Sequence, residues 1–187
     1  MRHSPVNRLD ETSWRVAAHL EWLWVCVSDE VTLYAILPGR GFVQAASILG
    51  EDYAGFLNHD GWQPYYRFVH AFHQSCLSHL IRRCKDMIET ASAAAARFPQ
   101  AVMQSLLDGL ALRDRYARQE ISLHGLSVAT GRLVANMERL LAKTFRDPAN
   151  RRLAKHLRHE EPWLFTFMGL RVIEWVDFRV ERASEGH

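Results

Sequence analysis

The apolar residues of this chain change their spacing once, at about Cys76. Before that point they form short continuous runs rich in aromatic and β-branched side chains, as strands do. After it they recur at steps of three and four, as on amphipathic helices. This change predicts a sheet in the first part of the chain and helices in the second, within an α/β or α+β layer fold. The 187 residues suffice for one sizeable domain with its own core.

The first part predicts a mixed sheet that contains a hairpin and a crossover helix. Residues 22–27 and 31–37 are expected to form two strands joined by a short polar turn, Ser28-Asp29-Glu30. A Pro-Gly-Arg-Gly segment ends this pattern, and residues 42–49 then show helical spacing. Further short strands are expected at residues 6–9, 53–57 and 69–72.

The second part predicts a series of amphipathic helices. Phe98-Pro99 is expected to separate the first two helices, and Gly125 to separate the second from the third. Asp147 followed by Pro148 has the form of an N-cap with proline at the first helical position, which predicts the start of a fourth helix. The expected helices occupy residues 77–96, 100–121, 126–145, 148–159 and 172–183.

Several protein classes are disfavoured by the sequence. No apolar run reaches the roughly 18 residues of a membrane span, and the polar segment 1–10 lacks the apolar region of a signal peptide. Three cysteines, Cys26, Cys76 and Cys84, form no disulfide-scaffold pattern and fit a reducing compartment. We therefore expect a cytoplasmic protein without a membrane partner.

Charge is unevenly distributed, although the net charge is only +2. Residues 1–75 hold 5 Lys and Arg against 8 Asp and Glu, whereas residues 76–187 hold 18 against 13. The strongest excess lies in residues 132–158 and suits a phosphate backbone, although a solvated helix face would show the same pattern. Its basic residues are Arg132, Arg139, Lys143, Arg146, Arg151, Arg152, Lys155 and Arg158.

Two aspartates are candidate metal ligands because each follows a predicted strand. Asp10 comes at the end of the strand expected at 6–9, and Asp60 follows an apolar strand and precedes a glycine. Residues at the ends of neighbouring strands converge at one edge of a sheet, where paired carboxylates can bind a divalent cation. The alternatives are a turn at Asp60-Gly61 and a capped loop at Asp10-Glu11-Thr12.

A third acid is available in the last predicted helix. Glu174, Asp177 and Glu181 follow one another at steps of three and four, so they share one face. They would equally serve as the solvated face of that helix, and their spacing alone does not choose among them.

A zinc site is the remaining metal hypothesis. His70, His73, Cys76 and His79 are zinc-ligand types at intervals of three. However, a change from strand to helix falls inside this stretch, which argues against a common centre and favours packing and hydrogen-bonding roles.

Several segments together resemble the insertion sequence 66 family of bacterial DDE transposases. The segment from Asp10 to Val16 is similar to that family's first acidic motif, and Asp60-Gly61-Trp62 with Pro64-Tyr65 to its second. The hairpin and the Pro-Gly-Arg-Gly segment lie between them in the family's order. The stretch 73–80 with Arg82-Arg83 resembles the family's Cys-x-x-His stretch.

The resemblance implies an RNase H-like fold in one domain spanning 1–187, with 76–162 as a largely helical insertion before the last acidic helix. It implies cleavage and strand transfer of DNA that depend on two Mg²⁺ or Mn²⁺ ions, in a homo-oligomer assembled on DNA near the nucleoid. The catalytic acids would be Asp10, Asp60 and Glu181. Glu181 is chosen because the family has Asn followed four residues later by Glu, and Asp177 stands at the Asn position. The basic residues of 132–158 would contact the DNA backbone.

The chain also departs from the family pattern. Ser13 replaces the usual Gly, and Asn7 and Arg8 are polar within the strand expected to carry Asp10. The family's N-terminal DNA-binding region and its final Arg-Pro segment have no counterpart here, so we expect a catalytic core cut short at both ends. The alternative is an inactive remnant that binds DNA through its basic helices.

Overall fold

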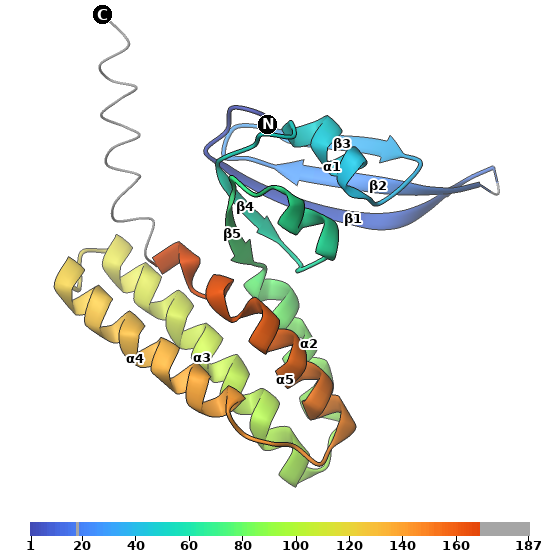
Figure 1. The fold of residues 1–187 in the computed structure, drawn as a ribbon. Coiled ribbons are helices and arrows are strands. Elements are labelled where there is room, and N and C mark those ends of the chain that lie inside the picture. Colours follow the sequence, from blue (N-terminus) through green and yellow to red (C-terminus); the bar gives the residue numbers. More distant parts are fainter. Residues whose placement is uncertain (18, 169–187) are drawn as a thin grey trace, which may run out of the picture. The chain divides into compact units, whose positions relative to one another are not determined.

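A computed structural model of the protein describes residues 1–17 and 19–168 (Figure 1). The chain divides into two compact units, with the boundary between Cys76 and Leu77. We call them the sheet unit and the helical unit, and each has its own hydrophobic core. The boundary falls where the sequence changes from strand to helix spacing.

The sheet unit holds a five-stranded mixed sheet with the order β3-β2-β1-β4-β5. β1 pairs with β2 and β2 with β3 in antiparallel fashion, whereas β1–β4 and β4–β5 are parallel. The mixed sheet and the hairpin of β2 and β3 confirm the expectation from the sequence. The strands are β1 (Val6–Val16), β2 (His19–Val27), β3 (Thr32–Leu37), β4 (Phe56–His59) and β5 (Phe72–Ser75).

Several strand boundaries differ from expectation. β1 has 11 residues and continues well beyond residue 9, because β2 pairs with it as far as Val16 opposite His19. β4 and β5 begin three residues later than expected. Tyr53 precedes β4 and is buried, and its hydroxyl lies 3.0 Å from the Ser4 carbonyl oxygen and 2.9 Å from that of Phe56. The tyrosine therefore joins the starts of β1 and β4.

The core of the sheet unit lies between one face of the sheet and helix α1 (Phe42–Leu49). Because side chains alternate along a strand, Leu9 and Glu11 of β1 share one face and Asp10 lies on the other. Leu9, Trp24 and Leu57 are buried on the covered face with Ala45 of α1. The 3₁₀ helix η1 (Gln63–Arg67) adds the buried ring of Tyr65 to this core.

Within residues 77–168, the helical unit packs four helices around a mostly aliphatic core (Figure 1). Leu106, Leu153 and Leu157 are among its fully buried side chains. A short 3₁₀ turn, η2 (Glu161–Trp163), follows the last of these helices. The helices are α2 (Leu77–Thr90), α3 (Ala93–Ala117), α4 (Leu123–Leu141) and α5 (Pro148–Glu160).

Two of the expected helix breaks are wrong. Pro99 lies inside α3, and the chain breaks earlier, where the Ser92 hydroxyl caps the helix. Pro99 has no N–H to donate to the carbonyl four residues back, and the side chain of Asn150 donates to that Ala95 oxygen at 2.9 Å instead. Gly125 lies within α4, which begins after an N-cap at Ser122.

The predicted start of α5 is confirmed. The Asp147 carboxylate accepts a hydrogen bond from the backbone N–H of Asn150 at 2.8 Å, and Pro148 is the first helical residue. Across the residues that the structure describes, no helix is long and apolar enough to cross a membrane. The helix predicted at 172–183 lies outside these residues.

Candidate active site

The two candidate aspartates belong to neighbouring segments of the sheet unit, Asp10 in β1 and Asp60 directly after β4. β1 and β4 run parallel, and their last paired residues, Arg8 and Asn58, precede these aspartates by two residues each. Asp60 directly follows the end of β4, as the sequence predicts. Asp10 lies within β1 and not at its end, so the expected strand end and the capped-loop alternative are both wrong. The extended pairing with β2 is the reason.

The pKa of the Tyr65 hydroxyl is affected by three carboxylates of the sheet unit. Burial raises this pKa far above the usual range, and the carboxylates of Glu11, Asp60 and Asp10 raise it further. All three carboxylates are therefore near enough to act on one hydroxyl group. The Tyr65 hydroxyl therefore stays protonated, and able to donate a hydrogen bond, near neutral pH.

A tight turn presents the Asp60 carboxylate. Gly61 has a φ of 86°, a left-handed conformation that favours glycine. One carboxylate oxygen of Asp60 accepts a hydrogen bond from the backbone N–H of Trp62 at 2.9 Å. The turn alternative is thus correct for Asp60-Gly61, and this turn is also what fixes the orientation of the candidate ligand.

Two buried histidines, His59 and His73, stabilise this turn. The Gly61 N–H donates to Nδ1 of His59 at 3.0 Å, so the proton of this ring is on Nε2, which lies 2.9 Å from Nδ1 of His73. His73 in turn has Nε2 at 3.2 Å from the Phe68 carbonyl oxygen. Burial, and then the neighbouring His73, lower the pKa of His59 to about 3, so both rings form a neutral hydrogen-bonded chain.

This chain bears on the zinc hypothesis. Both ring nitrogens of His73 face partners within the protein, which leaves neither of them to bind a metal. Within residues 1–17 and 19–168, no group of three or more His, Cys, Asp and Glu side chains is arranged to hold a metal ion. The packing and hydrogen-bonding role that the sequence favoured for His73 is the one observed.

Glu11 is a buried carboxylate that the sequence analysis did not single out. Its side chain is only 1% exposed, and its Oε1 accepts hydrogen bonds from Nη2 of Arg40 at 2.8 Å and from Nε at 3.1 Å. The Tyr65 hydroxyl donates to its Oε2. Burial raises the pKa of Glu11, and the hydrogen bonds from Tyr65 and Arg40 oppose this. The alternation of β1 would have indicated that Glu11 points inward, but not which cation meets it.

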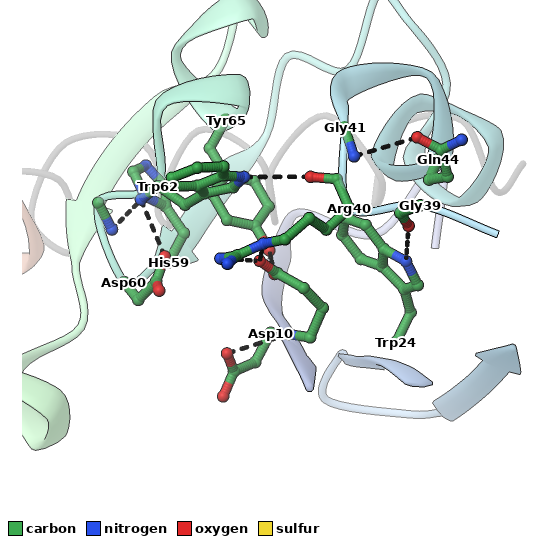
Figure 2. A network of polar contacts seen from close by, with 12 residues as sticks. Asp10, Trp24, Gly39, Arg40, Gly41, Gln44, His59, Asp60, Trp62 and Tyr65 are labelled. Carbon is green, nitrogen blue, oxygen red and sulfur yellow. Dashed lines mark hydrogen bonds and ion pairs between the residues drawn. The ribbon is translucent and has the colours of Figure 1, made fainter. Parts of the chain in front are cut away.

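Arg40 connects this carboxylate to two tryptophans. Its guanidinium lies 4.7 Å from the ring centre of Trp22 and 4.1 Å from that of Trp62. The indole N–H of Trp62 donates to the Arg40 carbonyl oxygen at 3.1 Å (Figure 2). Trp24 holds the adjacent residue, Gly39, by a 3.0 Å hydrogen bond to its carbonyl oxygen. The loop after β3, the turn after β4 and the middle of β1 are therefore one connected network.

The third candidate acid, Glu181, lies outside the described residues, as do Glu174 and Asp177. The eight basic residues predicted to contact DNA are all exposed, on α4, α5 and the segment between them. One of them has a structural task, since the guanidinium of Arg158 donates to the carbonyl oxygens of Leu141, the last residue of α4, and of Lys143 just after it. Among the described residues, no carboxylate pairs with Arg151, Arg152 or Lys155.

Comparison with known proteins identifies the family. The model of the family described as "Transposase IS66 family" matches residues 1–183. The chain belongs to the IS66 transposase family. The α+β class with a mixed sheet, expected from the sequence, is confirmed in this IS66 chain by the five-stranded sheet and the helices that follow it. No curated protein matches the IS66 chain.

A solved structure similar to this IS66 chain is the HTLV-2 integrase catalytic core domain in complex with magnesium, in a dimeric form. The two chains are 15% identical, and the match covers 51% of this chain and 83% of the integrase chain with a TM-score of 0.29. So limited a similarity carries no inference about the site.

Proposed function

We propose that this domain catalyses metal-dependent cleavage and strand transfer of DNA phosphodiesters, with Asp10 and Asp60 as metal ligands. The observation that carries the proposal is the parallel pairing of β1 and β4, whose last matched pair, Arg8 and Asn58, precedes both aspartates by two residues. Their joint effect on the Tyr65 hydroxyl supports it independently of the register. Membership of a transposase family makes DNA the expected substrate.

The donor set fits a hard divalent cation. Carboxylate oxygens are preferred ligands of Mg²⁺ and also suit Mn²⁺. Each aspartate has one oxygen held by a backbone N–H, from Glu11 for Asp10 and from Trp62 for Asp60. Two bound ions would lower the pKa of the attacking water or 3′-hydroxyl and stabilise the leaving oxygen.

The residues around the aspartates have supporting tasks. Glu11 follows Asp10 in β1, but Arg40 neutralises its charge and Tyr65 donates a hydrogen bond to it. It therefore adds no unpaired charge to the metal site. His59 fixes Gly61 and thereby the position of Asp60. Glu181 is proposed as the third ligand on the family pattern alone.

DNA binding is assigned to the exposed cations of α5, foremost Arg151, Arg152 and Lys155. In the part of the chain that the structure describes, no carboxylate forms an ion pair with these three cations, which leaves them available for phosphates. The contacts would be to phosphates and largely independent of sequence. A homo-oligomer that holds two DNA ends remains a prediction from the family.

The proposal is tested by nicking of supercoiled plasmid DNA by the full chain in Mg²⁺ or Mn²⁺. We expect Asp10→Asn, Asp60→Asn and Glu181→Gln each to reduce nicking by about a hundredfold or more, because each removes a ligand that neutralises transition-state charge. Asp52→Asn is the matched control, since Asp52 is an exposed aspartate a few residues before β4.

Two results would count against the catalytic role. Nicking that persists in all three variants would come from other residues or from a contaminant. A wild-type chain that binds DNA but never nicks it in either metal would favour the alternative function, a DNA-binding remnant that acts through α5.

A further inference from the structure

We infer that Trp62 is a stacking platform for an unpaired nucleobase of the DNA strand bound at Asp10 and Asp60. The inference rests on the proposed function for the location of that strand, and goes beyond it by assigning a base-binding residue. Its observations are the exposure of Trp62, the contacts that hold it rigid, and its position two residues after Asp60.

The exposure of Trp62 is unusual for its surroundings. The side chain is 39% exposed, whereas Trp24 in the same network is fully buried. A large aromatic surface that is exposed to water beside a polar site is a place where the ring of a ligand can stack. Trp22, the other ring over Arg40, is partly buried, so Trp62 is the more accessible of the two.

Trp62 is fixed in place by three contacts. Its backbone N–H binds the Asp60 carboxylate at 2.9 Å, its indole N–H binds the Arg40 carbonyl oxygen at 3.1 Å, and its ring lies 4.1 Å from the Arg40 guanidinium (Figure 2). Glu11 holds that guanidinium in turn. A ring that is already ordered loses little conformational entropy when a ligand stacks on it.

The location selects a nucleobase as the ligand. The backbone N–H of Trp62 donates a hydrogen bond to Asp60, a proposed metal ligand. A DNA strand whose phosphate is bound at that metal would therefore place its neighbouring bases beside the indole. Every base presents a π-face, so stacking tolerates any sequence, but a base must first leave the duplex to expose that face. The site therefore suits an unpaired base at a DNA end.

Charge distinguishes this contact from the basic surface of α5. The charge of Arg40 is balanced by Glu11, so stacking on Trp62 releases no additional counterion. Loss of the ring should weaken binding equally at all salt concentrations. Loss of α5 cations should instead reduce the dependence of binding on salt.

The experiment measures binding of the full chain to two duplexes with Ca²⁺ in place of Mg²⁺, over a range of salt concentrations. One duplex is blunt, and the other carries a 3′ overhang with 2-aminopurine at its first unpaired position. We expect Trp62→Ala to weaken overhang binding by roughly tenfold, as for the loss of one base–aromatic stack, and to abolish the quenching of 2-aminopurine. Blunt-duplex binding and the salt slope should stay the same.

Two further variants separate stacking from folding. Trp62→Phe keeps an aromatic face but loses the indole N–H, so it should retain most of the overhang preference. Trp14→Ala removes a tryptophan that is 47% exposed on β1 and should have no effect on that preference. Thermal unfolding of each variant provides the check on folding.

The outcomes distinguish this inference from the proposed function. Unchanged overhang binding and quenching in Trp62→Ala would overturn the stacking role, even if Asp10 and Asp60 prove essential for nicking. A lost overhang preference that Phe restores would support the stacking role, even if the chain never nicks DNA.

Discussion

Arg40 and Glu11 form the ion pair on which the candidate site depends. Arg40→Ala would leave a carboxylate that is 1% exposed without its cation. The side chain of Arg40 is itself 34% exposed, so water would relieve part of the cost. We expect the free energy of unfolding to fall by about 2–3 kcal/mol, toward the lower end of the effect of breaking a buried pair. Urea denaturation measures this loss.

The control for this prediction is Arg67→Ala. Arg67 lies 4.1 Å from the ring centre of Phe42 but has no carboxylate partner among the described residues, so its removal should cost less than about 1 kcal/mol. Adding Glu11→Gln to Arg40→Ala should recover part of the stability, because a neutral amide needs no cation. Equal losses in the two arginine variants would contradict the importance of the pair.

The cysteines differ in the reactivity that their surroundings permit. Burial raises the pKa of Cys26 and of Cys84 to about 11, so both stay protonated near neutral pH, whereas Cys76 is only partly buried. The thiolate is the nucleophile, so iodoacetamide at pH 8 should label Cys76 first. Peptide mass spectrometry of the folded chain checks this order, and all three should react in guanidinium. Fast labelling of Cys84 in the folded chain would show that the core of the helical unit opens.

At the scale of elements, the side chain of Asn150 replaces the hydrogen bond that Pro99 cannot make. Asn150 is 4% exposed and donates to the Ala95 carbonyl oxygen, which links α5 to α3. Asn150→Ala should lower the free energy of unfolding by about 1–3 kcal/mol, the cost of a buried unsatisfied carbonyl. Pro99→Ala supplies the missing N–H, so the double variant should lose less than the sum of the two single losses. Additive losses in this double-mutant cycle would refute the coupling.

Pro99 also shows what the sequence could predict about the elements and what it could not. The hairpin, α1 and the start of α5 follow from local patterns of apolar residues and caps, and all three were predicted. The break at Pro99 was wrong because the compensating donor is 51 residues away in the chain. The strand predicted at residues 6–9 was shorter than the observed β1. The polar residues of β1, among them Arg8 and Asp10, adopt the strand conformation because they pair with β2 and not because of their own propensity.

The sequence likewise predicted those parts of the candidate site that depend on short segments, and not those that depend on distant contacts. Asp10 and Asp60 follow from strand ends and from motif order, which are properties of short segments. Arg40 and Glu11 are 29 residues apart, and nothing local indicates that these two meet. The neutral His59–His73 chain likewise depends on the adjacency of β4 and β5, which the sequence suggested only through short strands.

At the scale of the whole molecule, the two aspartates proposed as metal ligands and the basic surface of α5 belong to different units, while the proposed third ligand, Glu181, falls within residues 77–187. The two hydrophobic cores share no residue, and the unbalanced cations lie in the helical unit, whereas the aspartates lie in the sheet unit. The sequence already separated them through its acidic first part and basic second part. A variant of α5 should therefore change affinity for DNA without changing the fold of the sheet unit.

The last prediction compares two sets of three cations in the helical unit. Replacing Arg151, Arg152 and Lys155 with Ala should weaken duplex binding and lower the slope of log K against log salt by about 2–3, because each phosphate contact contributes about 0.9. The matched control replaces the cations at the end of α3. Its residues are Arg113, Arg115 and Arg118, which pair with Asp114 and Glu120 at 2.7, 3.8 and 2.6 Å.

The two triple variants remove the same formal charge, so net charge alone would change the slope equally in both. A reduced slope in the α5 variant and a nearly unchanged slope in the α3 variant would mean that unpaired cations on one surface contact the phosphates. Equal slopes would mean that binding follows the overall charge of the helical unit. Electrophoretic mobility shifts with a blunt duplex at several salt concentrations distinguish the two cases, and they do so whether or not the aspartates cleave DNA.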